Sequence, residues 1–420
     1  MPTYTPPLRD MQFVMHEVFK VTDEFKAMPQ HAEVDVDTIN AVIEEAGKFA
    51  SEVIFPLNIS GDTEGCVLDK ATHEVKTPTG FKEAYDKYVE GGWAALSCDP
   101  AYGGQGLPFV LNQCLYEMMN SANQAWTMYP GLSHGAYEAL HAHGTDEQKK
   151  LYLPKLTSGE WTGTMCLTEP HCGTDLGLLR TKAEPQADGT YKLTGNKIFI
   201  SAGEHSMASN IVHLVLARLP DAPKGSKGIS LFVVPKFMVN KDGSLGARND
   251  AHCVSIEHKL GIKASPTAVL QFGDHGGAVG YLVGEENRGL EYMFIMMNAA
   301  RYAVGMQGIA ISERAYQKAV QYAKDRVQSR PVDGSIAASA PIIHHPDVKR
   351  MLMTMRATVE GCRAMATVAA AAFDAAHHHP DADTRKQNQA FYEFMVPLVK
   401  GYSTETSLEV TSLGVQVHGG

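Results

Sequence analysis

The 420-residue chain lacks the features that mark membrane, secreted and nucleic-acid-binding proteins. No apolar run approaches the roughly 20 residues that a transmembrane helix needs. Residues 1–7 have neither the apolar stretch of a secretion signal nor the arginine-rich pattern of a transit peptide. The net charge of −10 argues against nucleic acid as a main partner. We therefore expect a cytoplasmic protein that does not insert into membranes.

The chain is also poor in sequence patterns of metal, disulfide and nucleotide sites. Its seven cysteines are scattered, odd in number and without zinc-ligand spacing, so we expect a reducing compartment and no metal site. The histidine runs 344–345 and 377–379 lack partner ligands at metal spacing and are predicted to lie on the surface. No G-x-G-x-x-G follows a predicted strand and there is no P-loop, which disfavours Rossmann and nucleoside-triphosphate sites.

One apparent catalytic motif is rejected. Gly131–Gly135 has the G-x-S-x-G spacing of a hydrolase nucleophile elbow. That elbow directly follows a buried strand, whereas residues 122–130 have the pattern of a helix and a turn. We therefore do not expect a serine hydrolase.

What the chain does have is a hydrophobic period that changes twice. Apolar residues recur at helical spacing over about 37–156, short β-branched runs alternate with turn residues over about 163–282, and helical spacing returns from about 289. This order predicts an α+β multidomain fold with an N-terminal α-helical domain, a middle β-barrel or sandwich domain and a C-terminal α-helical bundle. We expect these domains to span residues 1–160, 161–283 and 284–420.

Two segments of the predicted β domain have side chains suited to a flat polar heterocycle. Cys166–Pro170 and the following Gly173–Asp175 offer hydroxyls and open backbone amides at a turn, with an ordinary capped turn as the alternative. Phe199 and Ser201 are two residues apart on a predicted strand, so alternation places them on one face. That face could stack against a ring and hydrogen-bond it, and a half-buried structural strand is the alternative.

Two arginines mark the predicted end of a helix in the C-terminal domain. Arg326 and Arg330 are four residues apart and would share a face if the helix extends that far. Two guanidinium groups on one face can bind a pyrophosphate. A solvated face is the more common arrangement, so both interpretations stay open.

In their order along the chain, these segments resemble the acyl-CoA dehydrogenase family, from about Gly92 to the last residue. Phe199–Gly203 resembles the family's W-I-T/S-x-G segment, with phenylalanine for the usual tryptophan, and Cys166–Pro170 looks like its T-E-P flavin segment. Pro100–Gly106, Gly144–Lys150 and Gln416–Gly420 resemble its P-x-x-Y-G-G-x-G, G-T-x-E-Q-K and Q-x-x-G-G segments. Each match alone is weak, but five in order are specific.

The resemblance implies an activity and partners. The family oxidises an acyl-CoA thioester to the 2-enoyl-CoA with FAD and passes the electrons to an electron-transfer flavoprotein. Thr168 and Ser201 would hydrogen-bond the isoalloxazine with Phe199 against it, while Arg326 and Gln416 would reach the FAD of a neighbouring subunit. A homodimer or homotetramer is therefore implied.

The full implied site has two parts. The cofactor-binding residues are Cys166, Leu167, Thr168, Thr174, Phe199, Ile200, Ser201, Arg326, Gln416, Gly419 and Gly420. The substrate-binding residues are Thr174, Asn298 and Arg301, with Thr174 near the FAD pyrophosphate or the thioester.

Besides Phe199, the chain departs from the family's pattern in two further places. His171–Cys172 replaces a small Gly-Ala pair, and Arg326–Arg330 lacks the common R-x-x-F-G ending. These departures and the N-terminal sequence resemble the corresponding segments of the long bacterial subfamily that includes 3-methylmercaptopropionyl-CoA dehydrogenase. The resemblance does not define the length or branching of the acyl chain.

The catalytic base is the residue that the sequence does not supply. The weakly acidic α-proton of a thioester needs a positioned carboxylate and a stabilised enolate. Family members take the base from a glutamate just before the helix arginine, which is Ala300 here, or from an I-Y-E-G-T-like segment after Q-x-x-G-G. The chain contains no such segment, so we expect the catalytic glutamate beyond Gly420, in a natural protein that continues.

Three functions are consistent with this pattern. The first is the dehydrogenase. The second is an acyl-CoA oxidase or a flavin-dependent monooxygenase of the same fold, which differ in how reduced flavin meets oxygen. The third is a catalytically incomplete FAD- or acyl-CoA-binding protein, which the absence of the base favours.

Overall fold

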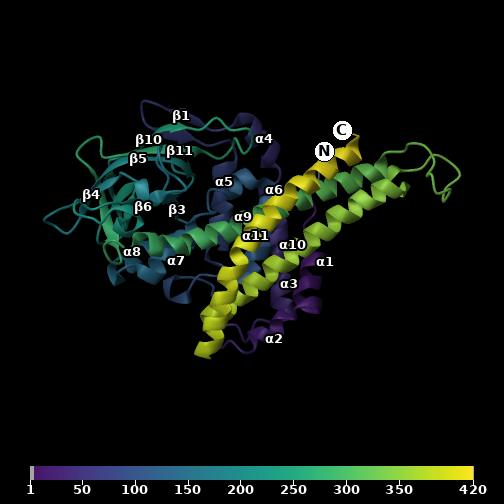
Figure 1. The fold of residues 1–420 in the computed structure, drawn as a ribbon, viewed down its shortest axis with the longest axis horizontal. Coiled ribbons are helices and arrows are strands. Elements are labelled where there is room, and N and C mark those ends of the chain that lie inside the picture. The colour runs from purple at the N-terminus through teal and green to yellow at the C-terminus, as the bar shows by residue number, and fades with distance from the viewer. Residues whose placement is uncertain (1–3, 420) are drawn as a thin grey trace. The chain divides into compact units, whose positions relative to one another are not determined.

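Residues 4–419 are described by the computed structural model, in which the chain forms two units (Figure 1). The helical unit comprises the chain up to Pro56, Leu107–Gln124 and the chain from Arg301 onward. The second unit, which contains the main β-sheet, comprises Leu57–Gly106 and Ala125–Ala300. The fold is therefore α+β, with helices before and after a β-rich middle part, as the sequence predicts.

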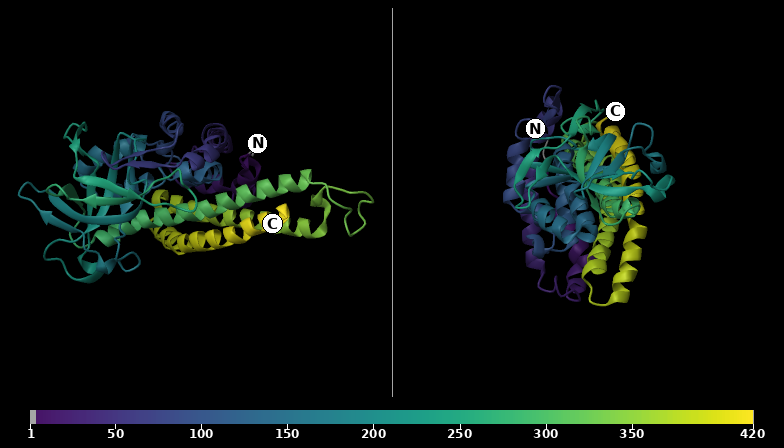
Figure 2. Two further views of the ribbon diagram at one scale, coloured as in Figure 1. Left: turned by 90° about the horizontal axis from the view of Figure 1, so that it is seen from above. Right: turned by 90° about the vertical axis from the view of Figure 1, so that its left-hand side faces the viewer.

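The helical unit begins with short helices and ends with long ones. Its N-terminal elements are α1 (Leu8–Gln12), a π-helical turn (Phe13–Val18), α2 (Val21–Phe25), α3 (Val36–Lys48) and a second π-helical turn (Phe49–Ile54). Its longer elements are most of α6 (Phe109–Thr127), the later part of α9 (Gly289–Asp325), α10 (Pro346–His378) and α11 (Ala382–His418). Figure 2 shows α10 and α11 side by side along much of their length.

Small and flexible side chains hold the long helices together. The three-helix core contains buried residues of α9, α10 and α11, namely Ala319, Ala323, Met351, Leu352, Met355, Val410 and Val417. Alanine and glycine let helix backbones approach closely, and methionine fills the irregular gaps that remain. Asp381 caps α11 by accepting a hydrogen bond of 2.8 Å from the N–H of Thr384.

A buried ion network joins three helices of this unit. The guanidinium of Arg363 on α10 lies 2.6 Å from Glu117 of α6 and 2.7 Å from Glu313 of α9. All three side chains are almost fully buried. Removing one member of such a network leaves an uncompensated buried charge, which typically costs about 3–5 kcal/mol.

The second unit combines helices with three β elements. Its helices are α4 (Leu57–Glu64), α5 (Phe81–Glu90), α7 (Ser133–His143) and α8 (Asp146–Ser158). A hairpin of β1 (Val67–Asp69) and β2 (Glu74–Lys76) and a ribbon of β8 (Phe237–Val239) and β9 (Leu245–Arg248) accompany the main sheet. A capping box fixes the start of α8, where Thr145 and Gln148 each bond the other's backbone.

The main sheet has the strand order β10–β11–β5–β12–β7–β6–β3, with β4 paired to β5. Its strands are β3 (Trp161–Cys166), β4 (Lys182–Pro185), β5 (Tyr191–Ser201), β6 (Asn210–Ala217), β7 (Ser230–Pro235), β10 (Ala251–Ile256), β11 (Thr267–Phe272) and β12 (Ala278–Val283). All neighbours are antiparallel except β3 and β6. Every residue of β6 and β7 is buried, as their continuous apolar runs lead one to expect.

The structure differs from the sequence prediction in two places. The β1–β2 hairpin lies within the stretch predicted as helical, because strands of three residues are too short to show a period of two. The helix α9 ends at Asp325, so Arg326 and Arg330 do not share a helical face. Among residues 4–419, no helix combines the length and apolar character that a membrane crossing requires.

Candidate functional site

The segment that follows β3 meets the end of β5. The N–H of Ile198 donates a hydrogen bond of 2.9 Å to the carbonyl of Thr168. The ammonium of Lys197 donates to the carbonyl of Leu167 at 2.9 Å. The structure therefore brings together two segments that the sequence singles out separately.

A buried ion pair fixes this junction. Lys197 is fully buried and donates to Glu169 Oε1 at 2.9 Å. The same carboxylate accepts bonds of 2.6 to 2.9 Å from the N–H of Arg180 and from the N–H and hydroxyl of Thr181. Burial favours the neutral acid, but the Lys197 charge and these donors outweigh burial and hold the pKa of Glu169 below its ordinary value. The role of Lys197 was not predicted, and its only sequence signal is a charged residue inside an apolar strand.

Phe199 lies at an irregularity of β5. The register between β5 and β11 shifts next to it, and Lys197 and Ile200, three residues apart, are both buried. A bulge there adds one residue, and beyond it Phe199, Ile200 and Ser201 are exposed, buried and half-buried in turn. Phe199 has φ of 60° and its side chain is 56% exposed. Positive φ is strained for a bulky residue, and such strain is found mainly at functional sites.

Thr168 and Ser201 both have half-buried side chains. Ser201 lies two residues after Phe199, and Thr168 is hydrogen-bonded to Ile198, the residue before Phe199. Ser201 pairs with Thr267 of β11. Within residues 4–419, neither hydroxyl has a hydrogen-bond partner. Partnerless hydroxyls beside an exposed aromatic ring fit the polar edge and flat face of a heterocycle such as isoalloxazine.

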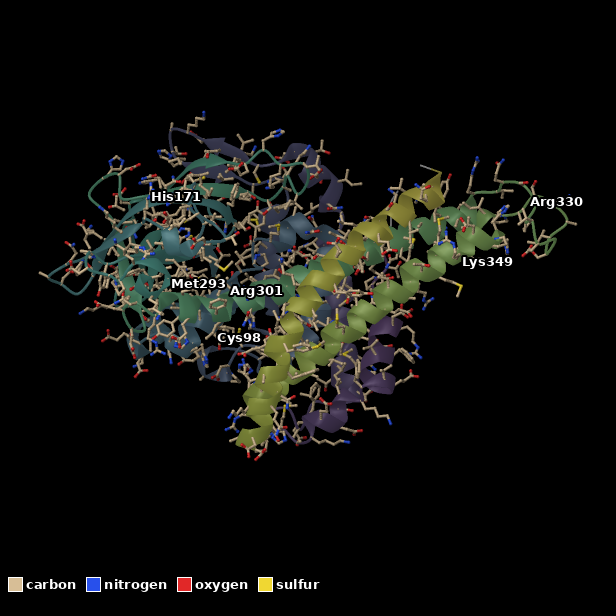
Figure 3. The ribbon with its side chains drawn as sticks, in the orientation of Figure 1. Cys98, His171, Met293, Arg301, Arg330 and Lys349 are labelled. Carbon is tan, nitrogen blue, oxygen red and sulfur yellow. The ribbon has the colours of Figure 1, made fainter. Side chains whose placement is uncertain are left out.

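A basic cavity of about 640 Å³ adjoins the exposed turn that contains Thr174. Its charged or titratable lining residues are His171, Asp175, Arg180, Arg218 and Lys224. The guanidinium of Arg218 is held by backbone carbonyls, including that of Gly177 at 2.6 Å. Figure 3 labels His171 in the β-rich unit. The excess of positive groups suits a phosphate-bearing ligand.

Asn298 and Arg301 stand three residues apart on α9 and are half-buried. Helical spacing places them on one face of that helix, and Figure 3 marks Arg301 there. Ala300, which precedes the arginine, supplies no carboxylate. The position before Arg301 therefore cannot provide a catalytic base.

The other predicted cofactor residues lie in the helical unit. The rings of Tyr322 and His418 stack at 4.4 Å, which places the end of α9 beside the end of α11. Arg326 and Gln416, which belong to these ends, are exposed. Gly419 ends α11 with φ of 96° in the left-handed conformation. Gly420 lies outside the described residues.

The two histidine runs reach the surface, as the sequence predicts. His377 is exposed, and the other four histidines are partly exposed. The ligand atoms of His378, His31 and Asp374 all lie within 4.8 Å of one another. Sequence spacing did not reveal this cluster, because His31 is remote from the other two in the chain.

The rejected hydrolase motif has no catalytic geometry. A turn, and no strand, precedes Ser133, which begins α7. Its hydroxyl accepts a hydrogen bond of 3.0 Å from the N–H of Gly163 in β3. This serine therefore positions a strand, and the sequence-based rejection is confirmed.

Comparisons with known proteins agree with this architecture. Three family models match: acyl-CoA dehydrogenase, N-terminal domain, over residues 37–160, the middle domain over 164–275 and the C-terminal domain over 287–420. The 3-methylmercaptopropionyl-CoA dehydrogenase of Ruegeria pomeroyi is 52% identical over 418 residues, which cover 100% of this chain and 70% of that protein.

Two further matches extend the comparison. A broad-specificity linear acyl-CoA dehydrogenase of Mycobacterium tuberculosis is 39% identical, over 100% of this chain and 69% of that protein. A chain in a solved structure of the electron-transferring flavoprotein of Acidaminococcus fermentans superposes with a TM-score of 0.73 at 25% identity, over 92% of this chain and 89% of that one.

Proposed function

The chain belongs to the acyl-CoA dehydrogenase family, and on this premise we propose that it uses FAD to oxidise an acyl-CoA thioester to the 2-enoyl-CoA. One observation supports the flavin site above all. The junction of Cys166–Thr168 with β5 combines two partnerless hydroxyls with an exposed and strained Phe199.

The chain's own residues hold and orient the cofactor. The hydroxyls of Thr168 and Ser201 would bond the polar edge of the isoalloxazine, and Phe199 would lie against its face. The Lys197–Glu169 pair keeps the Thr168 turn against β5, so that these groups are in place before binding. When bound, FAD accepts the electrons that leave the α,β bond of the substrate.

The substrate's CoA part interacts with basic and hydroxyl groups. Thr174, Asn298 and Arg301 contact the thioester or the neighbouring CoA atoms, and the basic cavity beside Asp175 suits a CoA phosphate. The similarity to the Ruegeria protein makes 3-methylmercaptopropionyl-CoA the first substrate to test, followed by linear thioesters of several lengths.

The α-proton would be removed by a carboxylate that the position before Arg301 does not supply. The position before Arg301 is Ala300, which cannot accept a proton. A carboxylate is required, because the α-proton of a thioester is too weakly acidic to leave without a positioned base.

The proposed reaction also requires an electron acceptor and an assembly of subunits. Electrons pass to an electron-transfer flavoprotein, in line with the shared fold of the Acidaminococcus structure. The enzyme acts in the cytoplasm as a homodimer or homotetramer, in which Arg326 and Gln416 reach the FAD of a neighbouring subunit.

The test is the visible spectrum of the purified chain, recorded without oxygen before and after adding a panel of acyl-CoA thioesters. Yellow protein whose flavin bleaches supports the dehydrogenase and refutes the placement of the base beyond Gly420. Yellow protein that never bleaches supports FAD binding with the base outside these residues. Colourless protein that stays colourless with added FAD contradicts the flavin site.

Variants make the assignment specific. Thr168→Val and Ser201→Ala should each weaken FAD retention, since each removes a hydroxyl that bonds the ring. Ser206→Ala, which removes an exposed hydroxyl of the same unit, is the matched control and should leave retention unchanged. Slow reoxidation of the bleached protein in air would separate a dehydrogenase from an oxidase or monooxygenase.

A further inference from the structure

Imidazoles and one carboxylate converge where the β1–β2 hairpin, the start of β10 and the β11–β12 turn meet. The ligand atoms of Asp250, His252 and His275 all lie within 4.8 Å of one another. The ring of His73 lies 5.3 Å from that of His252, centroid to centroid. All four residues belong to the same structural unit, and none takes part in the proposed flavin site.

Asp250 is oriented but incompletely satisfied. Its Oδ2 accepts hydrogen bonds from the N–H of His275 at 2.7 Å and of Gly277 at 3.1 Å. Its Oδ1 is buried, and within residues 4–419 it has no hydrogen-bond partner. The imidazole Nε2 of His252 lies 3.6 Å from this oxygen. A buried carboxylate oxygen without a partner is costly, and a bound cation would compensate for it.

A backbone hydrogen bond orients His73. Its Nδ1 lies 2.9 Å from the carbonyl of Cys253, which can only accept, so Nδ1 donates and Nε2 is the nitrogen that can bind a metal. This backbone bond is the usual outer support of a metal-binding histidine. The charge of the nearby Arg248 is paired with Glu204 at 2.9 Å.

We propose that Asp250, His252 and His275 form a binding site for a divalent metal ion of the zinc class, with His73 as the nearest further ligand. Imidazole and carboxylate donors suit zinc, which prefers four ligands at about 2.0–2.2 Å in a tetrahedron. Ligand atoms in such a site are about 3.3 Å apart, so closure here needs side-chain movements of roughly 1 Å.

Two other clusters of possible metal ligands are less suited to bind an ion than the Asp250 cluster. In Glu169, His171 and Cys172, the carboxylate already accepts four hydrogen bonds from Lys197, Thr181 and Arg180. In the cluster around Asp374, both carboxylate oxygens accept bonds from the first amides of α6. Of these three clusters among residues 4–419, the Asp250 cluster alone has a buried partnerless oxygen close to a histidine, His73, that is held by a backbone carbonyl.

Metal binding at this place would have a structural effect. The ligands come from the strand β10, the turn before β12 and, through His73, from the β1–β2 hairpin. An ion that binds only the folded chain stabilises it in proportion to its occupancy. The metal would thus link the β1–β2 hairpin to the main sheet and stabilise their contact.

The test is titration of the metal-stripped full chain with Zn²⁺ by calorimetry, and with Co²⁺ by its ligand-field absorption. We expect about one tight site per chain with the strong visible bands of tetrahedral Co²⁺. His275→Ala and Asp250→Asn should abolish that site, and His73→Ala should weaken it about 10–100-fold. His258→Ala, which removes an exposed histidine beyond β10, is the matched control.

Variants of the competing clusters decide which residues bind the ion. His378→Ala and His171→Ala should leave the tight site intact. His275 is exposed, so its replacement should preserve the fold even if Asp250→Asn does not. Absence of tight binding in the unaltered chain, its persistence in His275→Ala, or its loss only in His378→Ala or His171→Ala would overturn the proposal.

Discussion

The buried pair of Lys197 and Glu169 links stability to the proposed flavin site at the level of single residues. Lys197→Met should lower the free energy of unfolding by about 3–5 kcal/mol, because it leaves a buried carboxylate without its counter-charge. It should also weaken FAD retention, because the carbonyl of Leu167 loses its donor. Denaturant unfolding and the flavin absorbance of the purified variant measure the two effects.

An exposed pair in the same unit is the control. Lys82 and Asp86 form an ion pair on α5 with about half of each side chain exposed, so Lys82→Met should change stability by less than about 1 kcal/mol. The double variant Lys197→Met with Glu169→Gln should lose less stability than the sum of the single ones, since the two groups are coupled. Strict additivity would contradict the prediction.

Asp374 gives a prediction of pH dependence. Burial raises its pKa to about 7, although the N–H groups of Phe109 and Val110 oppose this shift. The folded chain therefore keeps a proton that the unfolded chain has lost, so this contribution to stability is full at low pH and disappears as pH rises through about 7. Asp374→Asn should make the fall in unfolding free energy between pH 5 and 7.5 less steep.

The titratable groups near position 374 are Glu24, His31 and His378, and they are the same in the unaltered chain and in Asp374→Asn. Their contribution to the pH dependence of the unfolding free energy therefore largely cancels when the slope of one protein is subtracted from that of the other. Asp347→Asn, on the exposed start of α10, is the control and should leave the slope between pH 5 and 7.5 unchanged. Equal slopes in the unaltered chain and in Asp374→Asn would show that burial does not raise this pKa.

At the scale of elements, replacing two glycines of the long helices by alanine should change the stability of the chain in opposite directions. A Cβ on Gly308 of α9 would lie 2.6 Å from the carbonyl oxygen of Ser403 on α11, so Gly308→Ala should destabilise the chain by roughly 1–3 kcal/mol. Gly401 of α11 has open space around it, so Gly401→Ala should stabilise by about 0.5–1 kcal/mol. Thermal unfolding of both variants measures the difference, and equal effects would contradict close packing of α9 against α11.

The elements that sequence predicts well are those with a sustained period. The runs that became β6 and β7, and the helical pattern of α10, contain enough apolar residues to identify both type and position. The β1–β2 hairpin is too short to show a period, and its Val75 is buried through contacts with the main sheet. The bulge at Phe199 depends on pairing with β11, which no local pattern encodes.

In the candidate site, too, the features that depend on tertiary contacts could not be predicted from sequence. Thr168, Phe199 and Ser201 could be proposed from sequence because hydroxyls and an aromatic in ordered motifs can be recognised without knowing their neighbours. The contacts of Lys197 and of the Asp250 cluster depend on segments that meet only in the folded chain. Sequence therefore proposes which residues face a ligand, whereas the residues that hold those candidates in place needed the structure.

At the scale of the whole molecule, the outer face of α11 bears on the proposed assembly. Phe391, Phe394, Leu398 and Tyr402 recur at helical spacing, and all four are exposed in the single chain. An exposed apolar stripe of this kind usually marks an interface between proteins. Because Arg326 and Gln416 also belong to the helical unit, subunit association and FAD retention should depend on each other.

The double variant Phe394→Glu with Leu398→Glu should therefore shift the assembly toward monomer, since two charges would be buried at the interface. It should also reduce FAD content, because the neighbouring subunit's contacts to the cofactor are lost. Light scattering after gel filtration gives the mass, and the ratio of flavin to protein absorbance gives the occupancy. Met353→Glu, on the exposed side of α10, is the control and should change neither. An unchanged mass in the double variant would show that subunits associate through another surface, and a monomer with full FAD would refute cofactor binding across subunits.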